Sequence, residues 1–216
     1  MEQRGRLGRP RVRGRRGAPA AAAVASRGLA AGARRARHAV RRPHPGPVDA
    51  GPIGLDPAAF SGWRSLAADP ALAARLDPWS RANVDRLAAL EADWAIAARG
   101  TTLLHGDLRA DNILLTDDRV LFVDWPQAAL GAPWVDLLCM LPSVTLQGGP
   151  DPAEVWRTSP VAAGADPAAV DSVLAAVTGF FVHSALLRAP PGLPHLRRFQ
   201  RLQGRPALAW LRSRVR

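Results

Sequence analysis

The sequence predicts an α+β fold that is mainly helical and carries one small β-hairpin. Two observations support this prediction. Aspartate-proline pairs recur immediately before stretches whose apolar residues are three or four positions apart, a pattern typical of capped amphipathic helices. Two short apolar runs, 112–115 and 120–123, flank the turn-forming residues 116–119, as expected for a β-hairpin.

The predicted helices before the hairpin begin at Asp69-Pro70 and Asp77-Pro78, where the aspartate caps the helix and the proline takes its first position. The second is expected to run from about residue 78 to Gly100, which would end it. Its apolar positions fall three or four apart and charged residues occupy its other faces. These apolar positions are Val84, Leu87, Leu90 and Trp94.

After Gly131 the sequence becomes helical again. Asp151-Pro152-Ala153-Glu154 has a reciprocal capping pattern, and Asp166-Pro167 starts a helix that Pro190-Pro191 should stop. A last helical stretch is expected from about His195 to the C terminus, with a break near Gly204-Arg205-Pro206 because glycine and proline both disfavour helix interiors.

Charge divides the 216-residue chain into two segments. Residues 1–48 contain 13 arginines and one acid, whereas residues 49–216 contain 16 arginines and 17 acids. The first segment, rich in Arg, Ala, Gly and Pro, has too little apolar surface to offset the entropy of ordering, so we expect it to be disordered. The second has the composition of a folded domain without a basic face, so nucleic-acid binding is not expected of it.

Three interpretations of residues 1–48 remain open. Arg15-Arg16 before the alanine-rich run 18–25 has elements of a twin-arginine export signal, although alanine forms a weak apolar core. The positive charge could instead form a basic arm for nucleic acid or a membrane surface. The favoured interpretation is a segment without an evolved fold, such as GC-rich coding sequence translated in the wrong frame or from a misplaced start.

The octapeptide 105–112, His-Gly-Asp-Leu-Arg-Ala-Asp-Asn, carries the chemical signal. Because the hairpin returns the chain on itself, Asp107 and Asn112 at its entry should lie close to Asp124 at its exit. Phosphoryl transfer to a hydroxyl needs a carboxylate near the acceptor and a divalent metal on the phosphates. Asp107 is our candidate for the first task, and Asn112 with Asp124 for the second. Gly106 permits a sharp turn and His105 braces the loop.

This octapeptide, together with Val123-Asp124-Trp125 and Gly131-Ala132-Pro133-x-x-Asp136-Leu137, resembles the aminoglycoside phosphotransferase family, which includes choline kinase-like enzymes. The resemblance covers the chain from about residue 50 and implies a protein-kinase-like C-terminal lobe. It implies Asp107 as catalytic base, Asn112 and Asp124 as magnesium ligands, and Asp136 as a buried acceptor that ties the catalytic loop to a following helix. It further implies ATP or GTP with Mg²⁺ and a small-molecule hydroxyl acceptor, such as an aminosugar or a choline-like amine.

The sequence departs from the family in one respect. The family's N-terminal lobe, with its phosphate-covering strand loop and lysine, has no counterpart here, and the chain contains no lysine. We therefore expect a truncated phosphotransferase. The alternatives are a catalytically inactive fragment or a basic-tailed nucleic-acid-binding protein. The sequence identifies neither the nucleotide-contacting residues nor the oligomeric state.

The remaining candidates have simpler interpretations. Cys139, the single cysteine, is expected to be a buried thiol, and one cysteine fits a reducing cytoplasm. No stretch was expected to reach the ~20 apolar residues of a membrane span, so no membrane association is predicted. Asp111 is expected to be an exposed turn residue. Packing or surface roles are expected for His183, His195, Trp63, Trp79 and Trp134.

Overall fold

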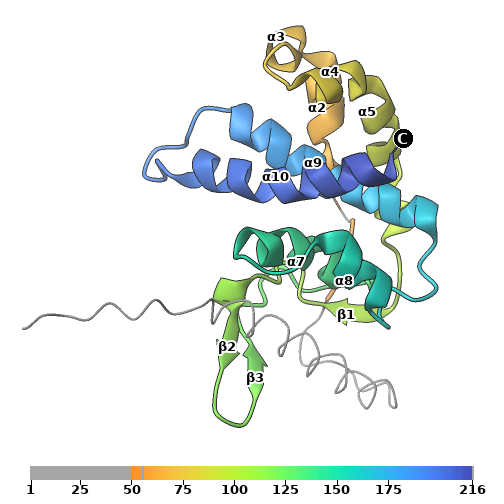
Figure 1. Ribbon diagram of the computed structural model, residues 1–216, viewed down its shortest axis with the longest axis vertical. Helices are drawn as coiled ribbons and strands as arrows, with labels where there is room; N and C mark the ends of the chain where they lie inside the picture. Colours follow the sequence, from red (N-terminus) through yellow and green to blue (C-terminus); the bar gives the residue numbers. More distant parts are fainter. Residues whose placement is uncertain (1–49, 55, 216) are drawn as a thin grey trace, which may run out of the picture.

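The structure, a computed structural model, describes residues 50–54 and 56–215, which form a mainly helical fold with two small antiparallel strand pairs (Figure 1). This arrangement agrees with the predicted mainly helical α+β class. The predicted disorder of residues 1–48 concerns residues outside those described. The helices are η1 (Pro57–Phe60), α2 (Gly62–Ala68), α3 (Pro70–Ala73), α4 (Pro78–Ala82), α5 (Val84–Ala92), α6 (Trp94–Ala97), η2 (Ala110–Asn112), α7 (Val135–Leu146), α8 (Pro152–Thr158), α9 (Pro167–Leu186) and α10 (Leu196–Arg214).

Helix α9 is the centre of the fold. It packs against α2, α5 and α6 on one side and runs beside α10, which in turn contacts α7 (Figure 1). α9 is apolar and 20 residues long, so by length and composition it could cross a membrane, and the expectation that no stretch approaches this length was wrong. Its apolar residues are instead largely buried within the fold, as in the core helix of a packed domain. Buried core residues include Trp63, Leu66, Leu87, Leu138, Leu141, Val170, Leu174 and Leu211.

Two glycines allow α2 and α9 to approach closely. A Cβ atom on Gly62 would lie 2.0 Å from the carbonyl oxygen of Gly179, so neither helix could keep its position with a larger residue there. At this crossing the indole N–H of Trp63 donates to the Ala175 carbonyl over 2.9 Å. The buried Glu91 of α5 accepts from the Trp63 backbone N–H over 2.7 Å and so caps the first turn of α2.

The four predicted aspartate-proline helix starts are confirmed. Asp69, Asp77 and Asp151 each accept two backbone N–H groups of the helix that follows, and Asp166 accepts one, from Ala168. In every case the proline occupies the first turn, where its missing N–H costs nothing.

Two helix predictions were wrong. The single helix expected over residues 78–99 is three short helices, separated at Asn83 and Asp93. Both residues have φ near −100° and ψ near 10°, outside helical geometry, and short polar side chains are the type that compete with helical backbone bonding. Conversely, α10 continues through Gly204 and Pro206, because Gly204 sits against Phe181 of α9 and tertiary packing outweighs the local preference.

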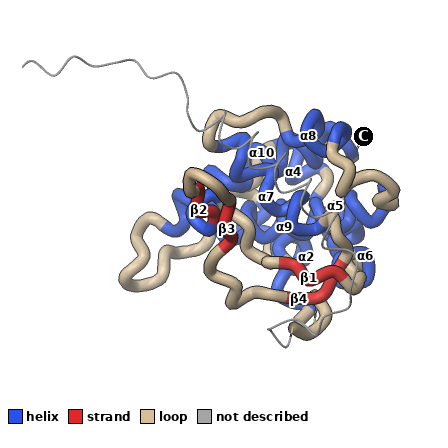
Figure 2. Tube along the Cα trace, turned by 90° about the horizontal axis from the view of Figure 1, so that it is seen from below, coloured by secondary structure: helices blue, strands red, loops and turns tan. Residues whose placement is uncertain are grey.

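The strands form two separate pairs at the margin of the helices (Figure 2). The predicted hairpin is confirmed, with Ile113 opposite Phe122 and Leu115 opposite Val120. The second pair was not predicted, and the segment before η1 extends it, since the Leu130 N–H donates to the Gly51 carbonyl over 2.8 Å. The strands are β1 (Thr102–Leu104), β2 (Ile113–Leu115), β3 (Val120–Phe122) and β4 (Ala129–Gly131).

Candidate active site

The loop between β1 and η2, residues 105–109, is fastened to helix α7 by one carboxylate. Asp136, in the first turn of α7, accepts the backbone N–H of His105 over 2.7 Å and that of Gly106 over 3.0 Å. Each of its two oxygens therefore holds one amide of the loop. Asp136 is half-buried rather than fully buried as expected, and its two acceptor bonds fix where Asp107 leaves the loop.

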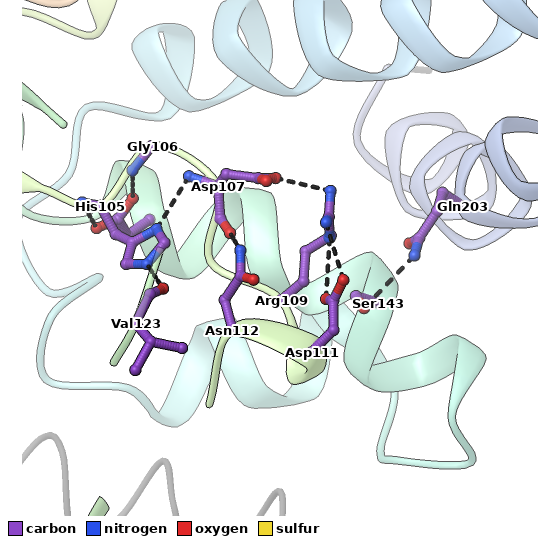
Figure 3. Close-up of polar contacts among 10 residues, drawn as sticks. His105, Gly106, Asp107, Arg109, Asp111, Asn112, Val123, Ser143 and Gln203 are labelled. Atoms are coloured by element: carbon purple, nitrogen blue, oxygen red, sulfur yellow. Dashed lines mark hydrogen bonds and ion pairs between the residues drawn. The ribbon is translucent and has the colours of Figure 1, made fainter. Parts of the chain in front are cut away.

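His105 braces the same loop from the inside. The residue is 2% exposed, its Nε2 lies 2.8 Å from the Val123 carbonyl oxygen, and its Nδ1 lies 3.3 Å from the backbone nitrogen of Asp107 (Figure 3). A carbonyl can only accept and an amide N–H can only donate, so the proton belongs on Nε2. The ring thus connects the loop to the end of β3, and Trp125 covers it at a centroid distance of 4.7 Å.

Gly106 is required for two reasons. Its φ of +78° lies in the left-handed region, and a Cβ atom there would be 2.2 Å from the backbone oxygen of Gln127. The segment after Asp124 therefore packs its backbone directly on the loop of residues 105–109.

The hairpin brings Asn112 and Asp124 to the same end of the loop. The Val123 N–H donates to the Asn112 carbonyl over 3.0 Å, which continues the β2–β3 pairing by one residue. The Asn112 amide donates to the Asp107 carbonyl over 2.8 Å, so its side-chain oxygen is the atom left for a ligand (Figure 3). Among the described residues, Asp124 is the one non-glycine with positive φ, at +64°. Backbone conformations of this kind are costly and concentrate at functional sites.

Asp107 is half-buried, and burial raises the pKa of its carboxyl. Arg109 opposes this effect, whereas the negative charges of Asp111 and Asp124 add to it. Asp124 follows Val123, whose N–H bonds to the Asn112 carbonyl, and the Asn112 amide in turn bonds to the Asp107 carbonyl. An aspartate whose pKa is raised holds a proton more tightly, which is the property needed in a group that accepts one.

Arg109 is a site residue that the sequence analysis missed. Its guanidinium donates to Asp107 over 3.0 Å and to both oxygens of Asp111, over 2.9 and 3.1 Å (Figure 3). The hydrogen bond from Arg109 lowers the pKa of Asp111, and that bond likewise raises the pKa of Arg109. The signal that was available is an arginine spaced two residues from an aspartate on each side, a spacing that in a tight loop favours ion pairs.

The donors around Asp107 fit a magnesium ion. Mg²⁺ is usually bound by one or two carboxylates together with water and substrate phosphates, rather than by a complete protein cage. Asp124 is exposed and supplies a carboxylate, and Asn112 supplies a neutral oxygen. Across residues 50–54 and 56–215 no group of three or more His, Cys, Asp or Glu side chains could hold a metal.

The other candidates take the packing or surface roles that were expected of them. Trp63 and Trp134 are buried, and Trp79 lies under the guanidinium of Arg212 at 4.9 Å. Cys139 is half-buried, where a fully buried thiol was expected, and burial raises the pKa of its thiol to about 12, so it is protonated at neutral pH. Asp111 is exposed, as predicted, although it is paired with Arg109. His183 is half-buried on α9 and His195 precedes α10.

Comparison with known proteins shows that residues 105–112 lie within a longer match to a protein-family model. The model of a family described as the phosphotransferase enzyme family matches residues 7–171, about three quarters of the chain. The match includes the loop of residues 105–109, the hairpin and α7. It begins at residue 7, within the arginine-rich segment, whereas the resemblance was expected to begin at about residue 50. Searches of curated proteins and of solved structures find no match.

Proposed function

Because the chain belongs to the phosphotransferase enzyme family, we propose that it transfers the γ-phosphate of ATP or GTP to a hydroxyl group of a small molecule. The observation that carries this proposal is the position of Asp107. It projects from a loop fixed by Asp136 and His105, with Asn112 and Asp124 at the adjoining end of the hairpin. These are the carboxylate and the two donors that phosphoryl transfer to a hydroxyl requires.

In the proposed reaction Asp107 accepts the proton of the acceptor hydroxyl. The hydroxyl oxygen attacks the γ-phosphorus, the bond from the γ-phosphorus to the bridging oxygen breaks, and the nucleoside diphosphate leaves. Asn112 and Asp124 would hold Mg²⁺, which when bound neutralises charge on the phosphate oxygens. His105 and Asp136 contribute by keeping Asp107 in one place, since a displacement of about 1 Å can cost on the order of 100-fold in rate.

The fixed geometry of the loop supports catalysis, and the absence of lysine from the chain limits how the nucleotide can be held. A related kinase fold uses a lysine for the inner phosphates. In this chain arginine side chains or backbone N–H groups would have to bind the inner phosphates of the nucleotide. A binding protein without turnover is therefore the competing possibility.

The test incubates the purified full chain with Mg²⁺, ATP or GTP, and a panel of aminosugars, amino alcohols, sugars and polyols. Release of nucleoside diphosphate is followed by a coupled assay and the phosphorylated product by mass spectrometry. We expect Asp107→Asn to lower kcat by about 10²–10⁴-fold, because removal of a general base has effects of that size.

The matched control is Asp117→Asn, which changes an exposed aspartate at the hairpin turn and should leave kcat unchanged. Turnover that survives Asp107→Asn would contradict the assignment of the base. Complete absence of turnover by the wild-type chain with every acceptor would favour the binding protein without catalysis.

A further inference from the structure

The last part of the chain carries positive charge without acids. Residues 172–216 contain eight arginines and neither aspartate nor glutamate, so the near-neutral composition of the folded domain conceals a division of charge. Two of the eight arginines are paired, Arg212 with Asp77 and Arg214 with Asp171. The arginines in the α9–α10 connection and in the first half of α10 form no ion pair within the part of the chain that the structure describes.

Three arginines gather at the C-terminal end of α9. They donate to backbone carbonyls of residues 185–188, Arg75 over 2.9 Å, Arg197 over 3.1 Å and Arg201 over 3.4 Å. These contacts are favourable by themselves, because the last carbonyls of a helix lack intrahelical partners and attract cations. Each guanidinium has five N–H donors and uses only some of them here, so donors remain for an external anion.

Arg188 and Arg198 extend this positive charge into solvent. Both are exposed, and neither side chain has a hydrogen bond or an ion pair among the described residues. Burial and the charge of Arg197 lower the pKa of His183 on α9, whereas Asp69 raises it, so one carboxylate opposes the arginines. The charge of this end of the molecule stays positive. Its five arginines form what we call the basic surface: Arg75, Arg188, Arg197, Arg198 and Arg201.

An apolar turn adjoins the basic surface. It lies in the connection between α9 and α10, at the edge of the molecule (Figure 1). The Leu193 N–H donates to the Pro190 carbonyl over 3.2 Å, and a Cβ atom on Gly192 would meet nothing within 4 Å, so the tip of the turn is open to solvent. Leu193 is 55% exposed and Leu187 is 37% exposed. Three prolines within residues 190–194 restrict the backbone, so the turn needs little further ordering to bind a partner.

We propose that the basic surface and the turn at residues 190–193 form a docking surface for a membrane that contains anionic lipids. The guanidinium groups bind the lipid phosphates, a pairing that suits arginine well. Leu187 and Leu193 enter the boundary between head groups and acyl chains. Attraction between arginines and an anionic leaflet and burial of apolar side chains at this depth both strengthen such binding.

The exposed leucines favour a bilayer over a nucleic acid as the partner. A phosphate backbone would satisfy the arginines equally well, but it offers no apolar layer for Leu187 and Leu193. The attachment lies on the surface of the membrane and needs no helix that crosses it. The expectation that the chain does not associate with membranes considered spanning segments, and this inference concerns peripheral binding.

The test follows the turn itself in the full chain. Leu193→Cys in a Cys139→Ser background provides one thiol for an environment-sensitive fluorophore such as NBD. Vesicles of phosphatidylcholine mixed with phosphatidylglycerol are compared with vesicles of phosphatidylcholine alone. We expect the emission to shift to the blue and to be protected from a soluble quencher with the anionic vesicles only, because the label then enters the bilayer. The same label at Asp117→Cys, on the exposed turn of the hairpin, should not respond.

Two sets of substitutions measure the contributions of charge and apolar surface. Arg188→Ala and Arg198→Ala should each weaken binding to the anionic vesicles about 5-fold, the effect of one arginine near an anionic surface. Leu193→Ser in the unlabelled chain should weaken it about 10-fold, measured by sedimentation, because less apolar surface is buried. The matched control combines Arg81→Ala and Arg86→Ala, which remove two exposed arginines from α4 and α5 and should leave binding unchanged. Thermal unfolding verifies that all variants are folded.

Residues 1–48 carry positive charge of their own and are present in every variant. Vesicle binding without a response of the label at residue 193 would assign attachment to another part of the chain and overturn the inference. An equal loss in the Arg81→Ala, Arg86→Ala control would show that only total charge matters and would overturn it too. So would arginine-dependent binding of poly(U) RNA by a chain that ignores the vesicles. These outcomes leave the proposed function untouched, since none of them measures phosphoryl transfer.

Discussion

The helical body is stabilised by a different kind of interaction from the loop of residues 105–109 and the β2–β3 hairpin that follows it. Around α9, Trp63 and Leu174 are completely buried, whereas Leu114 and Phe122 of the β2–β3 hairpin remain 49% and 39% exposed. Burial of apolar surface supplies most of the stability of a packed domain. The hairpin has little of it, and its position depends on its end, where the Val123 carbonyl bonds to His105. A change in one region should therefore leave the other largely intact.

The polar attachment also explains why the loop can hold an unfavourable arrangement. In addition to burial, the negative charges of Asp111 and Asp124 raise the pKa of Asp107, and this repulsion would be costly if nothing opposed it. Arg109 offsets part of it. The loop thus holds the Asp107 carboxylate at the protein surface. The loop itself is kept in place by Asp136, which belongs to the packed helical body.

The largest effect that distinguishes the two regions is expected for Gly106→Ala. The new Cβ would lie 2.2 Å from the Gln127 oxygen, so the loop or the segment after Asp124 must move. We expect kcat to fall by about 100-fold, the effect of a displacement near 1 Å. Steady-state kinetics measure this loss, and thermal unfolding should show that the helical body remains folded.

The control for this variant is Gly148→Ala. Gly148 has a similar positive φ of +84°, but a Cβ atom there would meet nothing within 4 Å. It should show the backbone cost alone, of order 1 kcal/mol, with unchanged kcat. Equal losses of activity in the two variants would mean that close packing on Gln127 does not position the loop.

The second largest effect is expected in the helical body, for a substitution of Glu91. Glu91→Ala removes the acceptor that caps α2 and leaves the buried Trp63 N–H without its partner, which should lower the free energy of unfolding by about 1–3 kcal/mol. Urea unfolding at pH 7 measures this loss, and kcat at saturating substrate should stay within about twofold of the wild type. Glu154→Ala, a change of an exposed glutamate on α8, is the control and should cost far less.

The contribution of Glu91 to the free energy of unfolding should also depend on pH. Burial raises the pKa of its carboxyl, although hydrogen bonds from Trp63 and Arg64 oppose the shift. The stability linked to its proton is thus fully present below the pKa of an unfolded glutamate and is lost as pH rises through the raised folded pKa. Glu91→Ala should lack that slope. A variant that keeps the wild-type slope would show that another group is responsible.

Local signals in the sequence were sufficient for the elements that local chemistry determines. The four helix starts at aspartate-proline pairs and the hairpin at residues 113–122 were predicted, because a cap or a tight turn involves residues close in the chain. The pairing of Val123 with Asn112, which brings Asp124 to the Asn112 end of the loop, followed from the same hairpin. The roles of these residues in catalysis stay predictions.

Features that depend on distant contacts were not predictable in this way. The breaks at Asn83 and Asp93 interrupt a continuous apolar pattern, and α10 continues through Pro206 because it packs along α9. The close approach of Gly62 to Gly179 joins residues more than one hundred positions apart. Arg109 was missed for a different reason, since its role depends on the direction of its side chain, which spacing alone does not give.

The smallest expected effect is at the edge of the body, at Asp77. This carboxylate caps α4 through the N–H groups of Trp79 and Ser80 and pairs with Arg212 of α10. Although burial alone would raise it, the pKa of Asp77 is lowered by the hydrogen bonds from Ser80 and by Arg212. Asp77→Ala should reduce the free energy of unfolding by about 1 kcal/mol, the usual value of such a cap, without affecting kcat.

The contribution of Asp77 to the free energy of unfolding should change with pH in the opposite direction to that of Glu91. A carboxyl with a lowered folded pKa stabilises the fold above the pKa of an unfolded aspartate, and this contribution is lost as pH falls through the folded value. The difference in unfolding free energy between the wild type and Asp77→Ala should therefore be constant near pH 7 and shrink under acid conditions. Denaturant unfolding between pH 7 and pH 3 measures it. A difference that grows on acidification would mean that the cap is made by the neutral acid, so that Asp77, like Glu91, holds its proton in the folded state.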